Sequence, residues 1–362
     1  MVKVLGLTFA KLSIIFETST QNCKKIHYFC ANFYRIDMSK YVTLILFSLL
    51  ASFSCKQAPK ANNNIVEINI PAFNADSAYF YTEKQVSFGP RVPNTSAHDS
   101  CGNYLADELR RFGATVIEQE TTLQLLDGTP IAIKNIIGSF QPENKDRILL
   151  CAHWDSRPFA DHDPDSNNWH TPIDGANDGA GAVAVLLEIA RQVQIKQPAI
   201  GLDIIFFDAE DWGEPNFPTT DKHFGTWCMG SEYWAKNPHV PDYNARFGIL
   251  LDMVSGLNAQ FYKEQISLQH APQIVQKVWE AAQALGYDSY FPNQQGGAIE
   301  DDHVKVIQFR NVPCIDIIHQ DPNSGTGFPP YWHTLDDTMK NVDKNALQTV
   351  GQTVLYVLYK EK

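Results

Sequence analysis

Short apolar stretches that resemble β-strands alternate with helical stretches over most of this 362-residue chain. The strand candidates are dense in β-branched and apolar residues and lie at 131–140, 147–153, 203–208, 247–254 and 312–318. Helical apolar spacing occurs at residues 77–88, 96–112, 179–194, 272–285, 301–310 and 344–359. This alternation predicts one three-layer α/β/α domain over residues 72–362, with a mixed, mostly parallel central sheet that helices cover on both faces.

Composition supports a globular domain and excludes one class of partner. Hydrophobic residues make up 44% of the chain, which is enough to build a sizeable core. The formal net charge is -12, and no run of Lys and Arg is longer than two residues. Because phosphate binding needs a basic face, we expect no nucleic-acid partner.

The N-terminal part of the chain has the pattern of an export signal. Lys40 precedes an apolar run at residues 41–53, which ends at Ser54 and Cys55. This order of charge, apolar run, small residue and cysteine is typical of a bacterial lipoprotein signal, which we expect over residues 38–55. A plain secretory peptide or a membrane anchor is the alternative.

This interpretation divides the rest of the N-terminal part. Residues 1–37 would be a misassigned upstream extension, Cys55 would carry the lipid, and residues 56–71 would form a tether. The expected location is the bacterial envelope, with the catalytic domain facing the periplasm and the lipid anchor as its only membrane contact.

The stretch F-F-D-A-E-D-W-G-E at residues 206–214 indicates a functional site. A buried strand leads directly into Asp208, Glu210 and Asp211, although like charges repel and each carboxylate is more stable in water. A cation or a proton must compensate for this charge. Ligands of such sheets bind at the carboxyl ends of the parallel strands, so we expect a site there.

Other polar side chains are predicted at the same edge of the sheet. His153 ends one strand, Asp252 lies near the end of another, and Asp178 follows the glycines of G-A-N-D-G-A-G. His333 lies in a Gly/Pro-rich loop of the C-terminal third. His and carboxylate ligands from separate strand ends suit Zn²⁺, and a catalytic zinc keeps one position open. The sequence therefore predicts a catalytic zinc site.

Five blocks carry a resemblance to a known group of enzymes. They are H-W-D-S (153–156), A-N-D-G-A-G (176–181), F-D-A-E-D (207–211), L-L-D (250–252) and W-H-T-x-D-D (332–337). In this order and spacing they resemble the M28-type zinc aminopeptidase clan, whose enzymes have a co-catalytic metal pair. The resemblance covers the chain from residue 88 to the end.

Three further stretches resemble one family of that clan, the glutaminyl-peptide cyclotransferases or glutaminyl cyclases. They are F-G-P-R-V-P-N-T-S-A-H (88–98), A-I-E-D-D-H (298–303) and F-P-P-Y-W-H-T (328–334). The aminopeptidases usually have a small residue at the position of Asp301, where the cyclases have Asp. The resemblance implies an acyltransferase that cyclises the N-terminal glutamine of peptides or proteins to pyroglutamate and releases ammonia.

The resemblance also implies a division of the metal-site residues. One zinc ion per chain would be held by Asp178, Asp211 and His333, whereas His153 and Asp252 would hold no second metal. Asp211 stands where the animal cyclases have Glu, and both residue types bind zinc.

The remaining implied roles concern protons and the substrate. Glu210 would take the proton from the attacking amine and return it to the leaving nitrogen. Asp301 would hold the leaving amide and share a proton or hydrogen bond with Asp252, which gives one member of the pair a raised pKa. Asp316 replaces a His of the animal enzymes behind the site. The implied substrate contacts are Trp332, Phe328, Ile299 and Glu300.

Two other functions compete with this hypothesis. In a two-zinc aminopeptidase, His153 and Asp252 would bind a second metal, with Asp316 near them, and Glu210 would activate water. In a non-enzymatic binding ectodomain on the same fold, metal ligands are usually lost, and none is lost in this chain.

Some features are left open by the sequence. A Cys101–Cys228 disulfide is compatible with an exported protein. The alternating acids of residues 161–168 hint at calcium, although a solvated loop is the favoured interpretation. A second pocket tryptophan of the cyclases has three candidates, Trp169, Trp212 and Trp227.

Overall fold

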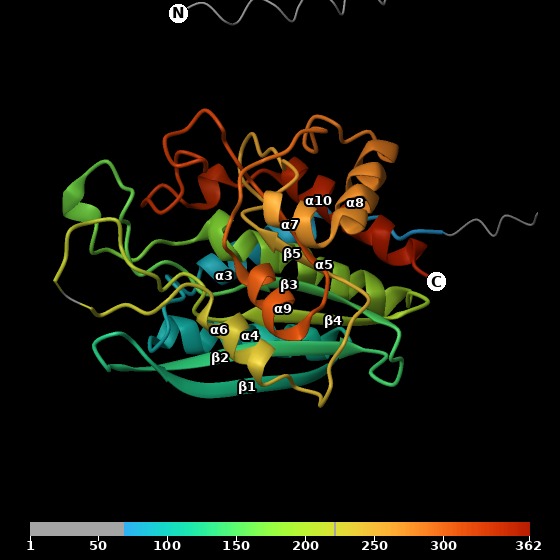
Figure 1. The fold of residues 1–362 in the computed structure, drawn as a ribbon, viewed down its shortest axis with the longest axis horizontal. Coiled ribbons are helices and arrows are strands. Elements are labelled where there is room, and N and C mark those ends of the chain that lie inside the picture. Colours follow the sequence, from blue (N-terminus) through green and yellow to red (C-terminus); the bar gives the residue numbers. More distant parts are fainter. Residues whose placement is uncertain (1–68, 221) are drawn as a thin grey trace, which may run out of the picture. The chain divides into compact units, whose positions relative to one another are not determined.

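The computed structural model describes residues 69–220 and 222–362, which form a three-layer α/β/α domain (Figure 1). The expected extension at 1–37, the signal peptide at 38–55 with Cys55, and most of the tether lie outside the described residues. Among the described residues, no helix has the length and apolar character needed to span a bilayer.

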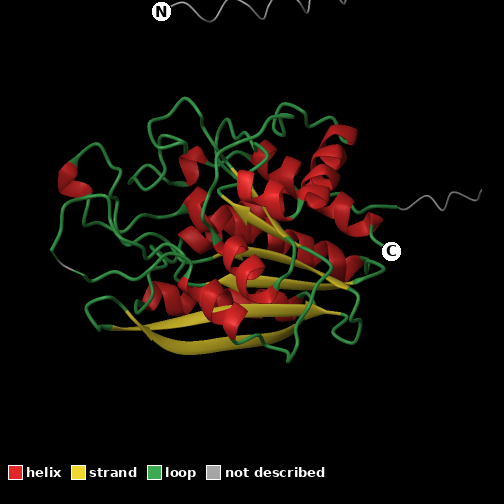
Figure 2. Ribbon diagram, viewed as in Figure 1, coloured by secondary structure: helices red, strands yellow, loops and turns green. Residues whose placement is uncertain are grey.

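A six-stranded sheet with the order β1-β2-β4-β3-β5-β6 forms the central layer. Its strands are yellow in Figure 2. Pairs β1–β2 and β2–β4 are antiparallel, while β4–β3, β3–β5 and β5–β6 are parallel, so the sheet is mixed and mostly parallel as predicted. The strands are β1 Thr115–Gln124, β2 Pro130–Phe140, β3 Arg147–His153, β4 Gly201–Phe207, β5 Gly248–Asp252 and β6 Cys314–Ile318.

Five of the six strands lie where the apolar runs predicted them, and strand β1 was missed. In β3, β4, β5 and β6 every residue is buried, which is why their runs are continuously apolar. Strand β1 is an edge strand whose residues are all at least partly exposed, and its sequence T-V-I-E-Q-E-T-T-L-Q is correspondingly polar.

Helices cover both faces of the sheet. Along β3, Ile148 and Leu150 pack into one core with α4 and α5, whereas Leu149 and Cys151 pack into another core with α6. The helices are α3 Ala75–Val86, α4 Ser96–Arg111, α5 Ala182–Ile195, α6 Met229–Lys236, α7 Gln265–His270, α8 Pro272–Ala284, α9 Asp302–Arg310 and α10 Lys344–Lys360.

Two short helices, α6 and α7, were not predicted, and one predicted helix begins late. The helix expected from residue 179 starts at Ala182, because Asp178 and Gly179 have non-helical backbone angles within the distorted turn Ala176–Gly181. Gly179 has φ 95°, and a Cβ there would lie 2.7 Å from the carbonyl oxygen of Asp155. This turn brings the Asp178 carboxylate to the carboxyl ends of the strands.

Candidate active site

The three predicted zinc ligands converge. Asp211 follows β4, Asp178 lies in the turn before α5, and His333 lies in the loop between β6 and α10 with φ 54°. His333 Nε2 is 3.1 Å from Asp211 Oδ1 and 3.6 Å from Asp178 Oδ2. All three side chains are buried, and their ligand atoms lie within 4.8 Å of one another. Two carboxylates and an imidazole therefore surround one point.

A second group of potential ligands shares Asp178. His153, the last residue of β3, places Nε2 3.0 Å from Asp178 Oδ1 and 3.2 Å from Asp252 Oδ1. These three residues are also buried, and their ligand atoms also lie within 4.8 Å. The geometry thus contains the ligand sets of both the one-zinc and the two-zinc hypotheses.

Buried acids hold the ligand-bearing backbone in place. Asp155 accepts hydrogen bonds from the backbone N–H groups of Glu210 (3.1 Å) and Asp211 (3.2 Å). Asp337 does the same for Asn177 (2.8 Å) and Asp178 (3.0 Å). Both acids lie inside sequence blocks that carry the family resemblance, but their function as backbone acceptors was not predicted from the sequence.

His333 is oriented by a residue whose sequence context suggested calcium. Its Nδ1 lies 3.3 Å from Asp161 Oδ1, and Asp161 is also bound by the buried Arg157 guanidinium, at 2.7 Å from Nη2. A carboxylate behind a metal-binding His fixes the ring orientation. Asp163 and Asp165 bind backbone N–H groups instead, at Leu335 and Asn167, so these loop carboxylates hold the chain rather than converging on a cation.

Burial and neighbouring charges set the protonation of the cluster. Burial and the charge of Asp211 raise the pKa of Asp178 to about 6 and raise the pKa of Glu210 well above its usual value. Burial opposes ionisation of Asp211 and of His333, but their mutual attraction is stronger. It lowers the pKa of Asp211 and raises the pKa of His333 to about 9. Metal binding would displace the protons that this cluster holds.

Asp301 and Asp252 line the same cavity. Burial, followed by the charge of Asp252, raises the pKa of Asp301 to about 8. Its Oδ1 accepts a hydrogen bond from the backbone N–H of Asp302 at 2.5 Å, while Oδ2 has no hydrogen-bond partner among the described residues. The charge of Asp252 therefore acts on Asp301, and the shared proton or hydrogen bond between the two acids stays a prediction.

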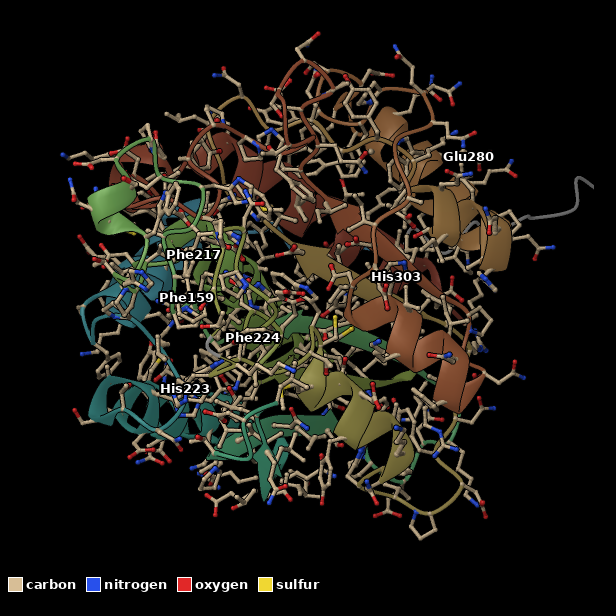
Figure 3. All side chains as sticks on the ribbon, turned by 60° about the vertical axis from the view of Figure 1, so that its left-hand side comes forward. Phe159, Phe217, His223, Phe224, Glu280 and His303 are labelled. Atoms are coloured by element: carbon tan, nitrogen blue, oxygen red, sulfur yellow. The ribbon has the colours of Figure 1, made fainter. Side chains whose placement is uncertain are left out.

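Asp316 lies deeper, behind the pocket. Burial and the charge of Asp301 raise its pKa well above the usual value, and its carboxylate oxygens have no hydrogen-bond partner among the described residues. Its potential ligand atom lies within 4.8 Å of those of Asp301 and His303. His303 lies near the start of α9 (Figure 3), with Nε2 3.4 Å from Glu264 Oε2.

A cavity of about 290 Å³ opens onto the cluster. Its lining includes the predicted contacts Ile299, Glu300, Phe328 and Trp332. Trp332 stacks on His333 with ring centroids 3.8 Å apart and packs against Phe328 at 4.6 Å. Glu300 is exposed at the cavity and pairs with Lys305 at 3.2 Å.

The structure distinguishes the three candidate tryptophans. Trp227 lines the cavity, lies parallel to the His333 ring at 6.1 Å, and is covered by the Arg157 guanidinium at 4.5 Å. Trp212 packs in a separate apolar cluster. Trp169 stacks on Phe217. The rings of Phe217 and Phe159, which Figure 3 labels, have centroids 5.7 Å apart.

The structure does not contain the Cys101–Cys228 disulfide that the sequence left open. Cys101 and Cys228 are both buried free thiols. Cys228 instead lies beside Glu210, with 3.2 Å between its Sγ and Glu210 Oε1.

The cluster fits a zinc ion. The donor set of two carboxylates and one imidazole is one that zinc accepts, with a further position available for substrate. Asp211 Oδ2 is buried without a hydrogen-bond partner among the described residues, as expected of an oxygen that would coordinate a cation. The buried negative charge requires the same compensation.

Comparison with known proteins defines the class of this α/β protein. The chain belongs to peptidase family M28, whose model matches residues 135–358. The crystal structure of a Zn-dependent exopeptidase from Parabacteroides distasonis is 60% identical, with a TM-score of 0.79 over 81% of this chain and 100% of that one.

Particular relatives narrow the class. Bacteroides thetaiotaomicron glutaminyl cyclase, solved with N-acetylhistamine, is 56% identical, with a TM-score of 0.79 over 81% of this chain and 100% of its own. Glutaminyl-peptide cyclotransferase from Bos taurus is 25% identical over 295 residues, covering 72% of this chain and 76% of its own. The predicted family resemblance and the predicted fold are thus confirmed.

Proposed function

We infer that this chain is a glutaminyl-peptide cyclotransferase that binds zinc and converts the N-terminal glutamine of peptides or proteins to pyroglutamate. The observation that carries this conclusion is the placement of Asp301 and Glu210 in one cavity beside the ligand cluster. The similarity to bacterial glutaminyl cyclases supports it.

The residues of the cavity fit an intramolecular reaction. The α-amine of glutamine forms a bond to its own side-chain carboxamide carbon, the bond to the amide nitrogen breaks, and ammonia leaves. Glu210 takes the proton from the attacking amine and returns it to the leaving nitrogen. A carboxyl group with a raised pKa is suited to both transfers.

The surrounding side chains position the substrate for ring closure. Asp301 accepts a hydrogen bond from the leaving amide, and Trp227, Phe328 and Trp332 enclose a small side chain and limit access of water. When bound by Asp178, Asp211 and His333, zinc supplies a Lewis acid for the carboxamide oxygen. We propose one zinc ion per chain at this position.

The product of a glutamine-initiated dipeptide tests this function. Incubation of the purified chain with Gln-Ala should release one ammonia per pyroglutamyl-alanine formed, with no free alanine. Chelation of the metal should abolish the reaction and added zinc should restore it. Free glutamine and alanine without ammonia would contradict the proposal.

A two-zinc aminopeptidase is a second candidate because His153, Asp178 and Asp252 also converge. In that enzyme Glu210 would activate water and the N-terminal residue would be released. The same dipeptide assay separates the two reactions, since only the peptidase forms free alanine.

We also propose that the chain is exported and anchored to the bacterial envelope by a lipid on Cys55, with its catalytic domain facing the periplasm. This proposal rests on the sequence pattern of residues 38–55. Full-length protein expressed in a bacterial host should incorporate radiolabelled palmitate and partition into detergent, and Cys55→Ala should do neither. Equal labelling of both proteins would contradict it.

A further inference from the structure

Cys228 contacts the residue to which we assign proton transfer. Its Sγ lies 3.2 Å from Oε1 of Glu210. The same residue pair is joined along the backbone, because the N–H of Cys228 donates to the carbonyl oxygen of Glu210 at 3.0 Å. The next residue repeats this contact, with Met229 N–H donating to the carbonyl of Ala209 at 3.1 Å. These two backbone hydrogen bonds thus hold the start of α6 against the segment that follows β4.

The backbone at Cys228 is fixed in an unusual conformation. Cys228 has φ 61°, in the left-handed region that a non-glycine residue adopts at a cost on the order of 1 kcal/mol. The nearby Gly230 allows the close approach, because a Cβ there would lie 2.1 Å from the carbonyl oxygen of Asp208. The position of the thiol relative to Glu210 is therefore set by the surrounding backbone.

The thiol is a hydrogen-bond donor at this position. Cys228 is fully buried, and burial together with the charges of Glu210 and Asp302 raises its pKa well above the usual value. It consequently keeps its proton and can donate it in a hydrogen bond to the carboxylate. Among the described residues, it is the one side-chain donor to the Glu210 carboxylate. The backbone N–H of Glu210 donates to Asp155.

We propose that Cys228 is a positioning residue, whose S–H donates to Glu210 Oε1 and holds the carboxyl group in one orientation, so that Oε2 exchanges protons with the substrate. This proposal rests on the proposed cyclase function. A thiol suits the task because it orients the carboxylate without releasing its own proton to it. The buried Cys101 of α4, which lies in the main core, has no such contact with Glu210.

Three variants test this role. Cys228→Ala removes the donor, Cys228→Ser keeps a hydroxyl donor, and Cys101→Ala is a matched control for loss of a buried sulfur. Loss of a hydrogen bond to a charged group should lower kcat of Cys228→Ala about tenfold, with KM within about twofold of wild type. Cys228→Ser should recover most of kcat, and Cys101→Ala should leave both constants unchanged. Zinc content and melting temperature, measured for each variant, show whether the fold and the metal site are retained.

A structural measurement separates this proposal from the proposed function. In crystals, Glu210 should occupy one rotamer in wild type and in Cys228→Ser, and several rotamers in Cys228→Ala. The same single rotamer in all three proteins would overturn the positioning role, as would wild-type kcat in Cys228→Ala or equal loss in Cys228→Ser. If the wild-type chain releases no ammonia from Gln-Ala, the proposed function fails, and the rotamers alone decide the role of Cys228.

Discussion

The three acids at the end of β4 have three different partners. Asp208 is paired with His98, whose Nε2 lies 2.9 Å from both carboxylate oxygens. Asp211 faces His333 in the ligand cluster, and Glu210 faces the cavity with Cys228 beside it. Histidines compensate the charges of Asp208 and Asp211, so these two carboxylates are compatible with burial. Only Glu210 is left without a cationic partner at hydrogen-bond distance among the described residues, as a proton carrier requires.

Replacing Glu210 by Gln should remove turnover but not the metal. The amide cannot carry the proton from the amine to the leaving nitrogen, so kcat should fall by about 10²- to 10⁴-fold. Zinc content should be unchanged, because the proposed ligands remain. The exposed acid Glu280 on α8 (Figure 3) provides a control, and Glu280→Gln should keep wild-type kcat. A Glu210→Gln variant as active as this control would disprove the proton-transfer role.

Asp301→Asn should separate cyclisation from folding. The amide keeps the shape of the side chain but loses the carboxylate that we expect to hold the leaving amide. We expect kcat for Gln-Ala to fall by about 10- to 100-fold, with a melting temperature close to that of wild type. Unchanged kcat would remove the main reason to prefer a cyclase to a peptidase.

At the scale of elements, Glu264 links α7 to the substrate cavity. Its carboxylate caps α7 by accepting from the backbone N–H groups of Ile266 (2.7 Å) and Ser267 (2.5 Å). It also accepts from the N–H of the cavity residue Ile299 at 3.0 Å and faces His303. One buried carboxylate thus fixes a short helix and one wall of the cavity.

Removing the Glu264 carboxylate should lower the free energy of unfolding more than removing a more exposed helix cap. Glu264→Ala leaves several buried donors without an acceptor, and we expect the free energy of unfolding to fall by about 3 kcal/mol. Asp343, the partly exposed cap of α10, accepts from the backbone N–H of Asn345, and Asp343→Ala should lower the free energy of unfolding by about 1 kcal/mol. Urea unfolding of both variants checks the difference. Equal losses would show that Glu264 acts as an ordinary cap.

The contribution of Glu264 should also depend on pH. Burial favours its neutral form, but the interaction with His303 and hydrogen bonds from the backbone outweigh burial and lower its pKa to about 2 from a usual 4.5. Its ionised form therefore stabilises the folded protein above about pH 4.5, and this stabilisation is lost as the pH falls towards 2. The difference in unfolding free energy between wild type and Glu264→Gln should shrink between pH 6 and pH 3. A constant difference would contradict this assignment.

The strands predicted best from the sequence are those in which every residue is buried. Strands β3 to β6 are buried on both faces, so their apolar runs were visible. Strand β1 was missed because its edge position permits polar side chains, and α6 was missed because its eight residues depend on packing against α9 and the sheet. The sequence placed Asp178, Asp211 and His333 at one edge, and the structure brings them together. The sequence could not predict the roles of Asp161, Arg157 and Cys228, because their contacts with the site depend on the paths of loops.

At the scale of the whole molecule, the topology explains why one edge of the sheet carries the chemistry. Strands β3, β4 and β5 run parallel, so the residues that follow them emerge at the same edge. The turn before α5 and the loop before α10 add Asp178 and His333 from opposite halves of the sequence. A metal bound there ties these distant segments together, so chelation should lower the melting temperature as well as activity.

The most direct test of this account is anomalous diffraction at the zinc absorption edge from crystals of the zinc-loaded chain. We predict one strong peak per chain, bounded by Asp178, Asp211 and His333. A second peak between His153 and Asp252, or a single peak away from Asp211 and His333, would contradict it.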